Sequence, residues 1–421
     1  MSKRRSVPSA LMILVLVAAA IVFLWRGPCR AIPRNGVDLS APYVASMRYQ
    51  AYTNPYTPLE FLPVWHAQGA PLWLWVDYSG QRPVYPPSTL LVLAPLAHMR
   101  WIYALSTYEY LCVVLYGCLL YLLAANVDRG WNSWRRTVFV AYGLLLAPIH
   151  SGLAVANLSI LTFILCLYSL LFVEKGRDIA AGILLAIALC IKPTTGIILL
   201  PYFLVRKQWR ASFIAVALAG IITAAAMLHM HSIPPSWHID YQQNLAYLFG
   251  PHGAANYATD YGARFELLNL QVPFFELTHS KMAANLLSWL LSGVLFAIWI
   301  RLLLRKGGVK NPWLIAGALL LFGLLPVYQR AYNAGFVLIA ILWALQHLER
   351  RAGKWILGIA AVFLLPGEAI LRTLYWRIPV PVVESKLWNF ILMPQATWGI
   401  LAIAFILLWV MAHPSKSPET A

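Results

Sequence analysis

An acidic side chain stands in an unusual setting near the start of the chain. Asp38 belongs to the stretch NGVDLSAPY, which follows closely on an apolar run from Leu11 to Leu24. A carboxylate beside a hydrophobic environment is costly unless it is solvated, and it can accept a proton from a hydroxyl group. Asp38 is therefore a candidate catalytic base. The alternative is that Asp38 is the N-cap of an amphipathic helix on the outer membrane surface, formed by the apolar and aromatic residues between Leu39 and Tyr52.

A lysine interrupts a second apolar stretch. Lys192 and Pro193 lie in CIKPTTG, between the apolar runs Ile179–Ile191 and Thr194–Val205. Proline breaks helical hydrogen bonding, and a lysine inside a membrane must find an anion or water. We expect Lys192 to neutralise a phosphate, while the alternative is that its ammonium extends to an interface.

A polar turn separates two late apolar runs. In PVYQRAYNAG, positive charge, aromatic rings and an amide occur together between Trp313–Pro326 and Gly335–Leu345. Such a turn can hold both a sugar and a phosphate, although a plain interfacial turn would share some of these residues. The candidates for binding a donor are Tyr328, Arg330, Tyr332 and Asn333.

The segment after Asp38 carries two short proline motifs. Asn54-Pro55-Tyr56 is the first, and Tyr85-Pro86-Pro87 opens an apolar run. Because proline fixes the backbone and withholds a donor, these prolines are expected to be structural, with Pro87 near the start of a short helix. Tyr85 is a further candidate for the donor site. Alternative polar candidates in the same loop are Glu60, His66 and Asp77.

The composition is that of a membrane protein. Of 421 residues, 61% are hydrophobic and 11% are charged, whereas a soluble domain has about 25% charged residues. The 18 tryptophans and 21 tyrosines fit aromatic belts at two membrane interfaces. No cysteine framework, zinc pattern or nucleotide-binding glycine loop is present, so no metal, cofactor or nucleic acid is expected.

The spacing of apolar runs and basic loops predicts the topology. We expect a single all-α domain over residues 1–421 with roughly 11–12 transmembrane helices and both termini in the cytoplasm. The extracytoplasmic side then holds residues 27–102, which include interfacial helices, and the large loop 231–281. Two alternatives remain: Ser88–Met99 crosses the membrane, and Ile179–Val205 forms one tilted span rather than two halves.

The order of these motifs resembles glycosyltransferase family 87. The resemblance rests on Gly36-x-Asp38, the two proline motifs, Lys192-Pro193 and the late Pro-x-Tyr-x-Arg-x-Tyr turn, and runs from about Asp38 to Asn333. It implies a C-type glycosyltransferase bundle in the inner membrane, with its active site on the extracytoplasmic side. Characterised members are mannosyltransferases that use polyprenyl-phosphate-mannose. Some relatives carry an aspartate or a histidine pair where this chain has Asn333, which leaves the sugar open.

The resemblance also implies roles and partners. Asp38 would be the base, and Lys192 with Pro193 would form the donor-side break. The expected partners are a polyprenyl-phosphate-linked sugar, a glycolipid or glycan acceptor, and membrane lipids. Cations at the donor phosphate would lower the barrier, and a single displacement would invert the anomeric carbon. A transporter or flippase of lipid-linked sugars is the alternative, but the sequence shows no related halves.

Overall fold

The protein is described by a computed structural model over residues 9–34, 36–58, 61–70, 82–127, 133–251, 253–258, 263–305, 309–375 and 377–413. Apart from an isolated bridge between Leu267 and Arg330, regular structure in these residues is helical. The prediction of an all-α protein is confirmed.

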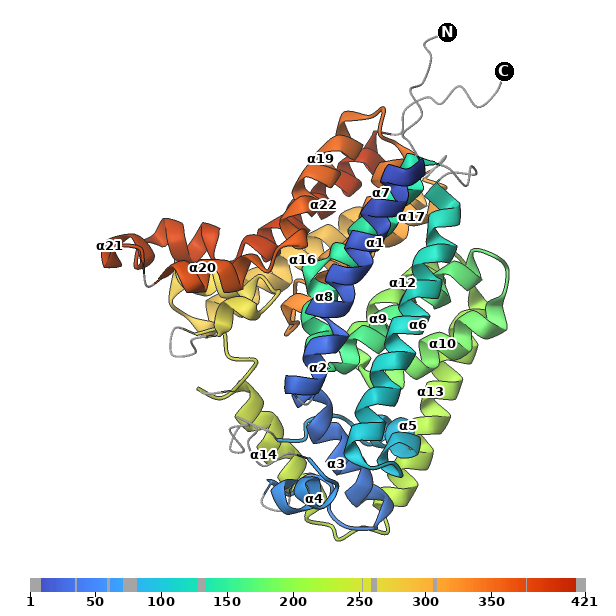
Figure 1. Ribbon diagram of the computed structural model, residues 1–421, viewed down its shortest axis with the longest axis vertical. Coiled ribbons are helices and arrows are strands. Elements are labelled where there is room, and N and C mark those ends of the chain that lie inside the picture. The colour runs from blue at the N-terminus through green and yellow to red at the C-terminus, as the bar shows by residue number, and fades with distance from the viewer. Residues whose placement is uncertain are drawn as a thin grey trace.

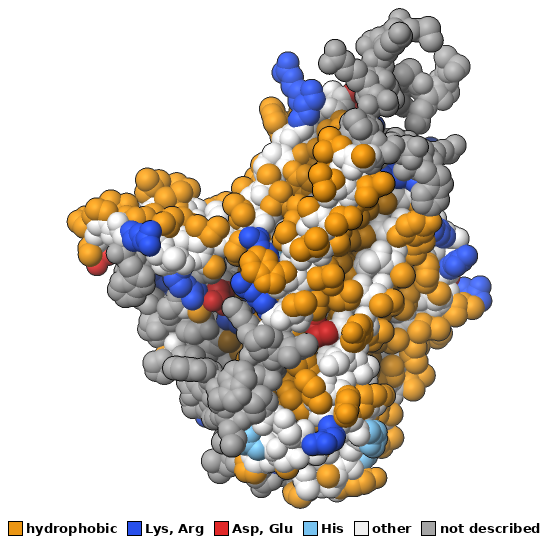
Figure 2. Space-filling view, viewed as in Figure 1, with side chains coloured by type: hydrophobic (Ala, Val, Ile, Leu, Met, Phe, Trp, Pro, Cys, Tyr) orange, Lys and Arg blue, Asp and Glu red, His pale blue; other side chains and the backbone are white. Residues whose placement is uncertain are grey.

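Six helical stretches of the described residues are long and apolar enough to cross a membrane. Their outer faces carry exposed aliphatic and aromatic side chains, and Figure 2 shows an apolar surface along the bundle. These faces fit a hydrocarbon environment, which makes this a multi-pass membrane protein. The stretches are built from α1 (Ser9–Arg26) with α2 (Pro28–Arg34), α6 (Trp101–Val127), α7 (Trp134–Leu145) with α8 (Ala147–Ala154), α13 (Trp209–Met230), α16 (Lys281–Leu304) and α22 (Gln395–Ala412).

Shorter apolar helices fill the centre of the bundle. In α9 (Leu158–Val173), α17 (Pro312–Phe322) and α18 (Val337–Gln346), nearly every residue is buried. Helices enclosed by protein need not reach both membrane surfaces, because neighbouring elements rather than lipid surround their ends. Against the expected 11–12 membrane helices, six described stretches are long enough to cross, and six shorter apolar helices of 10–17 residues, Pro87–Ala97 among them, accompany these six.

The chain around Lys192 forms a helical hairpin. One arm is α10 (Asp178–Ile191), and the other runs through α11 (Pro193–Gly196), a short 3₁₀ turn and α12 (Leu200–Val205). At the end far from Lys192, the second arm is tied to the C-cap of α9, where Glu174 accepts a hydrogen bond of 2.5 Å from Tyr202 and pairs with Arg206 at 3.8 Å. Residues 179–205 are thus two halves rather than one tilted span, as the sequence favoured.

A layer of short helices covers one end of the bundle. It contains α3 (Val37–Gln50), α4 (Phe61–Ala67), α5 (Pro87–Ala97) and α14 (Trp237–Phe249), and lies opposite the end where α1 starts and α22 stops (Figure 1). At 11 residues, α5 rises only about 16 Å, half of the hydrocarbon thickness. It is too short to cross the membrane unaided.

A lateral arm leaves the bundle after α19 (Arg351–Ala360). The apolar run Trp355–Leu371 is not one helix, because Pro366 separates α19 and a 3₁₀ turn from the next helix. The arm projects sideways in Figure 1 and has an apolar surface in Figure 2. In this arm the side chains of Val380 and Leu387 are 61% and 62% exposed. It consists of α20 (Gly367–Tyr375), α21 (Val380–Val383) and a π-helical turn, Leu387–Leu392.

Candidate active site

Distant parts of the chain line one cavity of about 920 Å³. Its wall is formed by the start of α3, the segment before α5, the tip of the α10–α12 hairpin, α14 with the chain that follows it, the start of α16, and the late polar turn. Most of the residues expected to act on a substrate therefore face the same space. The predicted site residues in this wall are Asp38, Tyr85, Pro86, Lys192, Pro193, Tyr328, Arg330 and Tyr332.

A glycine allows the backbone to bring Asp38 into this wall. Gly36 precedes α3 with φ of 51°, in the left-handed region. A Cβ at this position would lie 2.4 Å from Leu105 Cδ1, so both conformation and space favour glycine. The backbone amide of Asp38 then donates a 2.9 Å hydrogen bond to the carbonyl of Val155. This explains the Gly36-x-Asp38 spacing.

The expectation of an N-capping aspartate on an amphipathic surface helix is wrong. Gly36 occupies the N-cap position, and Asp38 lies inside the first turn without capping it. Ten of the 14 residues of α3 are buried, including residues on opposite faces of the helix. The aromatic stripe therefore packs inside the protein instead of lying on lipid, and the side chain of Asp38 is available to the cavity.

Asn157 connects Asp38 to the rest of the site. Its Nδ2 donates hydrogen bonds to Asp38 Oδ2 at 2.7 Å and to the Tyr332 hydroxyl at 2.8 Å. Its Oδ1 accepts a hydrogen bond from the Ser159 amide at 2.8 Å. The last bond caps α9, as expected for an asparagine at a helix start. Tyr108 also donates 2.6 Å to the Asn157 carbonyl. One buried amide thus fixes the orientation of the carboxylate.

The lysine stands at the tip of the hairpin. Lys192 is the residue between α10 and α11, and its Nζ donates to Ser159 Oγ and lies 5.6 Å from the centre of the Tyr332 ring. A built Cβ on Gly196 would approach the Leu189 amide nitrogen to 2.9 Å, which shows how closely the chain turns back after Pro193. The reversal places the ammonium at the cavity.

Arg330 comes from the turn before the 3₁₀ helix Ala331–Phe336. Its guanidinium pairs with Glu266 at 3.1 Å, and the other oxygen of Glu266 pairs with Arg372 of the lateral arm at 3.0 Å. The backbone is held by an antiparallel bridge to Leu267 and by a 2.7 Å bond from the Leu268 amide to the Gln329 carbonyl. The arginine is therefore positioned through both its backbone and its side chain.

Asn333 does not line the cavity. It is fully buried, and its Nδ2 donates 2.6 Å to Gln329 Oε1. Gln329 in turn donates 3.3 Å to the Thr194 carbonyl in the hairpin. Asn333 thus belongs to a chain of hydrogen bonds that connects the late turn to the hairpin tip. It does not belong to the groups that line the cavity.

The proline motifs hold the wall near Tyr85. Tyr56 is buried, and its hydroxyl donates 2.9 Å to the Tyr85 carbonyl. Asn54, before Pro55, donates 2.6 Å to Asp240 of α14. Pro86 precedes α5 and Pro87 is its first residue, as the sequence predicted. Of the alternative polar candidates, Glu60 and Asp77 lie outside the described residues, and His66 contacts the Ala70 carbonyl.

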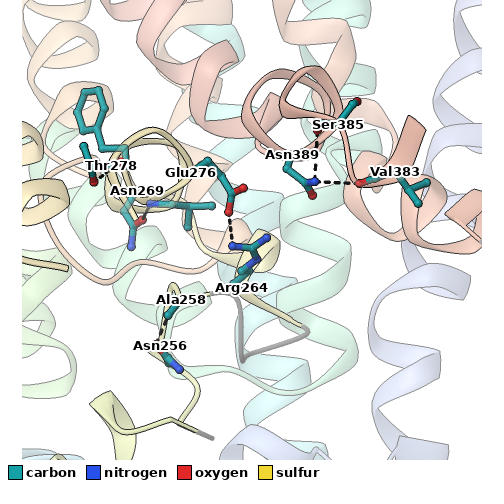
Figure 3. Close-up of polar contacts among 11 residues, drawn as sticks. Asn256, Ala258, Arg264, Asn269, Glu276, Thr278, Val383, Ser385 and Asn389 are labelled. Carbon is teal, nitrogen blue, oxygen red and sulfur yellow. Dashed lines mark hydrogen bonds and ion pairs between the residues drawn. The ribbon is translucent and has the colours of Figure 1, made fainter. Parts of the chain in front are cut away.

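An ion pair and a hydrogen bond brace the chain between α14 and α16. Arg264 pairs with Glu276 of α15 (Gln271–Thr278), and Asn256 Oδ1 accepts 3.1 Å from the Ala258 amide. In the arm, Asn389 donates 2.8 Å to the Val383 carbonyl (Figure 3). The Arg264 and Asn256 contacts stabilise the segment that places Tyr257 in the cavity wall.

Burial and charge act in opposite directions on Asp38, which lies outside the candidate membrane spans. Burial raises the pKa of its carboxyl, and Arg330, the Asn157 hydrogen bond and Lys192 lower it, with a net rise above the ordinary value. Burial and the nearby Asp38 charge likewise raise the pKa of Tyr85. A carboxylate with a raised pKa is a stronger base than an exposed aspartate, which suits proton acceptance near neutral pH.

One side of the cavity is apolar. Ile191, Leu245, Leu248, Phe249 and Trp289 contribute to it, and Trp289 is 62% exposed on the outer surface of α16. The cavity thus joins a polar region holding Asp38 and cations to an apolar wall beside a lipid-facing helix. Such a space can bind a molecule with an anionic head and a hydrocarbon chain.

The charged groups in the described cavity wall are one carboxylate and four cations. Asp38 is the only carboxylate among the described lining residues, and no group of three or more His, Cys, Asp or Glu side chains with metal-binding placement occurs in the described part of the chain. The charged groups that can meet an anion here are lysine and arginine.

Sequence reasoning missed three contributors. Asn157, Glu266 and Arg82 are not among the site residues that the sequence predicts. Arg82 lines the cavity and lies 4.2 Å from the centre of the Tyr247 ring. Its place just before the Tyr85-Pro86-Pro87 motif was a signal in the sequence, whereas the contacts of Asn157 and Glu266 depend on the fold.

Comparison with known proteins identifies the family of this chain. The model of the family described as Glycosyltransferase family 87 matches residues 84–320, more than half of the chain. The crystal structure of apo ArnT from Cupriavidus metallidurans aligns over 96% of this chain and 78% of its own, with 14% identity and a TM-score of 0.33. No curated protein matches the sequence significantly. The protein belongs to glycosyltransferase family 87, and is a membrane glycosyltransferase.

Proposed function

We propose that the enzyme transfers a sugar, with mannose as the first candidate, from a polyprenyl-phosphate donor to a glycolipid, glycan or protein outside the cytoplasm. The observation that carries the proposal is the shared cavity, in which the Asp38 carboxylate, the cations Lys192 and Arg330, and an apolar wall face one another. Membership of family 87 favours this reading over a transporter or flippase.

The chemistry is a single displacement. The acceptor oxygen forms a bond to the anomeric carbon while the bond from that carbon to the phosphate oxygen breaks. The hydroxyl proton passes to the Asp38 carboxylate, and the electron pair of the broken bond stays on the polyprenyl phosphate. Inversion at the anomeric carbon follows because attack and departure occur on opposite faces.

Lys192 and Arg330 stabilise the leaving group. Negative charge develops on the phosphate as the bond breaks, and fixed cations act strongly in a site that excludes water. Glu266 on Arg330 and Ser159 on Lys192 hold these cations in place before the donor arrives. Tyr328, Tyr332 and Tyr85 offer rings and hydroxyls to the sugar.

The apolar wall accommodates the lipid tail. Leu245, Leu248 and Phe249 of α14 face Trp289 of α16 within the cavity lining. Since α16 also carries exposed apolar residues such as Leu286 and Leu290, a prenyl chain can pass from the bilayer to the polar region without crossing water.

The proposed orientation places the cavity outside the cytoplasm, in the inner membrane. Basic residues such as Arg206, Lys207, Arg350 and Arg351 lie in short connections, after α12 and at the start of α19. The excess of lysine and arginine in short cytoplasmic loops supports this direction.

The direct test uses purified protein in lipid nanodiscs with labelled polyprenyl-phosphate-mannose and membrane glycolipids. We expect label to move to the acceptor with release of polyprenyl phosphate. Asp38→Asn should retain donor binding and lose transfer, whereas Lys192→Ala should weaken both donor binding and turnover.

Glu384→Gln provides the matched control, because it makes the same carboxylate-to-amide change on an exposed residue of the arm. It should transfer normally. Near-normal transfer by Asp38→Asn would refute the assignment of Asp38 as the catalytic base. If the protein consumed none of several polyprenyl-phosphate sugars, the proposed class of donor would be refuted.

A further inference from the structure

The cavity has more positive charge than the donor needs. Its described lining contains four cations and one carboxylate, Asp38. A polyprenyl-phosphate sugar carries a single negative charge on its phosphodiester, and Lys192 and Arg330 are the cations that meet it in the proposed reaction. Two positive groups, Arg82 and Lys281, are then left without an assigned partner.

Arg82 is arranged to receive an anion. Its guanidinium lies over the Tyr247 ring at 4.2 Å, and its Nε is shielded from solvent without a hydrogen-bond partner in the described structure. Stacking uses the face of the guanidinium and leaves the N–H groups at its edge free. This planar edge matches the two oxygens of a phosphate or carboxylate.

The backbone around Arg82 is fixed. The side chain of Asn244 in α14 donates a 3.0 Å hydrogen bond to the carbonyl of Pro83, and the Tyr56 hydroxyl donates a 2.9 Å hydrogen bond to the carbonyl of Tyr85. Arg82 is three residues from Tyr85, a separation of at most about 11 Å along the chain. Arg82, Tyr85 and Asp38 line the same cavity of about 920 Å³, so an acceptor held at the base can also reach Arg82.

We propose that Arg82 binds an anionic group on the acceptor, close to the hydroxyl that is glycosylated. This inference rests on the proposed function and specifies its acceptor: a glycan with a phosphate or carboxylate on the reacting sugar or its neighbour. The guanidinium selects the acceptor, while Asp38 takes the proton.

Binding measurements test this without requiring turnover. Octyl mannoside in neutral, 6-phosphorylated and 6-carboxylated forms would be titrated against the protein in nanodiscs of neutral lipid, with tryptophan fluorescence as the readout. In the native protein we expect at least one anionic form to have a Kd about tenfold below that of the neutral form. Comparison of the phosphorylated and carboxylated glycosides shows which anionic group Arg82 prefers.

Two variants should remove this preference. Arg82→Gln deletes the cation, and Tyr247→Leu removes the ring that holds it. In both, the ratio of neutral to anionic Kd should fall toward one while the neutral Kd changes little. Arg100→Gln makes the same charge change on an exposed outer arginine that does not line the cavity and should keep the native ratio.

Equal binding of all three glycosides by the native protein would overturn the proposal, as would a ratio that survives Arg82→Gln or falls equally in Arg100→Gln. Loss of donor binding in Arg82→Gln with an unchanged acceptor ratio would assign Arg82 to the donor. A failure of the donor assay, by contrast, refutes the proposed function and leaves these acceptor affinities measurable.

Discussion

The side-chain amide of Asn157 lies 2.7 Å from the Asp38 carboxylate, although 119 residues separate the two along the chain. A hydrogen bond of this kind stabilises the ionised carboxylate and fixes the direction of its free oxygen. It therefore links the helix cap of α9 to the proton acceptor of the site, and its loss should be visible in the pH dependence of the reaction.

Asn157→Ser separates these two roles. Serine can still cap α9, but it is too short to reach Asp38. Losing the hydrogen bond raises the pKa of Asp38, and since the ionised carboxylate is the active form, the acid limb of the pH–rate profile should move to higher pH. We expect kcat to fall about tenfold or more, because the lost bond involves a charged acceptor. Thermal unfolding should change little, and an unshifted profile would contradict the role of Asn157.

Two arginines that share one carboxylate should behave differently. Arg330→Gln removes a cavity cation, so kcat/KM should fall about 100-fold, and the acid limb should again move upward because Arg330 lowers the pKa of Asp38. Arg372→Gln breaks an exposed ion pair on the other oxygen of Glu266 and should change kcat/KM by less than about threefold. Steady-state kinetics at several pH values distinguish the two. Equal losses would show that Glu266, and not the cation in the cavity, is the critical group.

Gly36→Ala should destabilise the site through its backbone. The left-handed φ and the 2.4 Å approach to Leu105 together predict a cost of about 2–3 kcal/mol, a lower Tm and reduced transfer. Gly176→Ala is the matched control, because Gly176 also has positive φ but nothing within 4 Å of its built Cβ. It should cost about 1 kcal/mol. Equal losses of stability would mean that contact with Leu105 contributes nothing.

Cysteine accessibility tests the proposed orientation. In a background lacking the native cysteines, Tyr52→Cys places a thiol on an exposed residue at the end of α3, and Lys207→Cys places one beside the base of the hairpin. An impermeant maleimide should label Tyr52→Cys in intact cells and Lys207→Cys only after lysis. The reverse pattern would invert the topology.

Local signals predicted the parts of the site that depend on local chemistry. The break at Lys192-Pro193 was evident because proline cannot continue a helix, and Gly36 marked a backbone position that few residues tolerate. The membrane class followed from composition. The interruption at Pro366 was also present in the sequence, within an apolar run that hydropathy alone joins together.

Other features depend on the packing of distant segments. The stripe after Asp38 has the spacing of a surface helix, and only the helices packed around α3 make it a buried one. Asn333 looked like a donor-binding residue because it follows Arg330, but the 3₁₀ turn directs its amide to Gln329. The link from Glu266 to Arg330 joins segments that no periodicity relates.

The length of the hairpin that carries Lys192 sets how far its ammonium reaches into the cavity. Its second arm is fastened to Glu174, the residue that ends α9 shortly before α10 begins, and α10 spans 14 residues before the tip. One residue inserted between that fastening and the tip would lift the ammonium by about 1.5 Å and swing it by about 100°. The length of α10 therefore sets the position of the Lys192 ammonium. Sequence variation in the loops outside the bundle can change the acceptor side of the cavity without moving this ammonium.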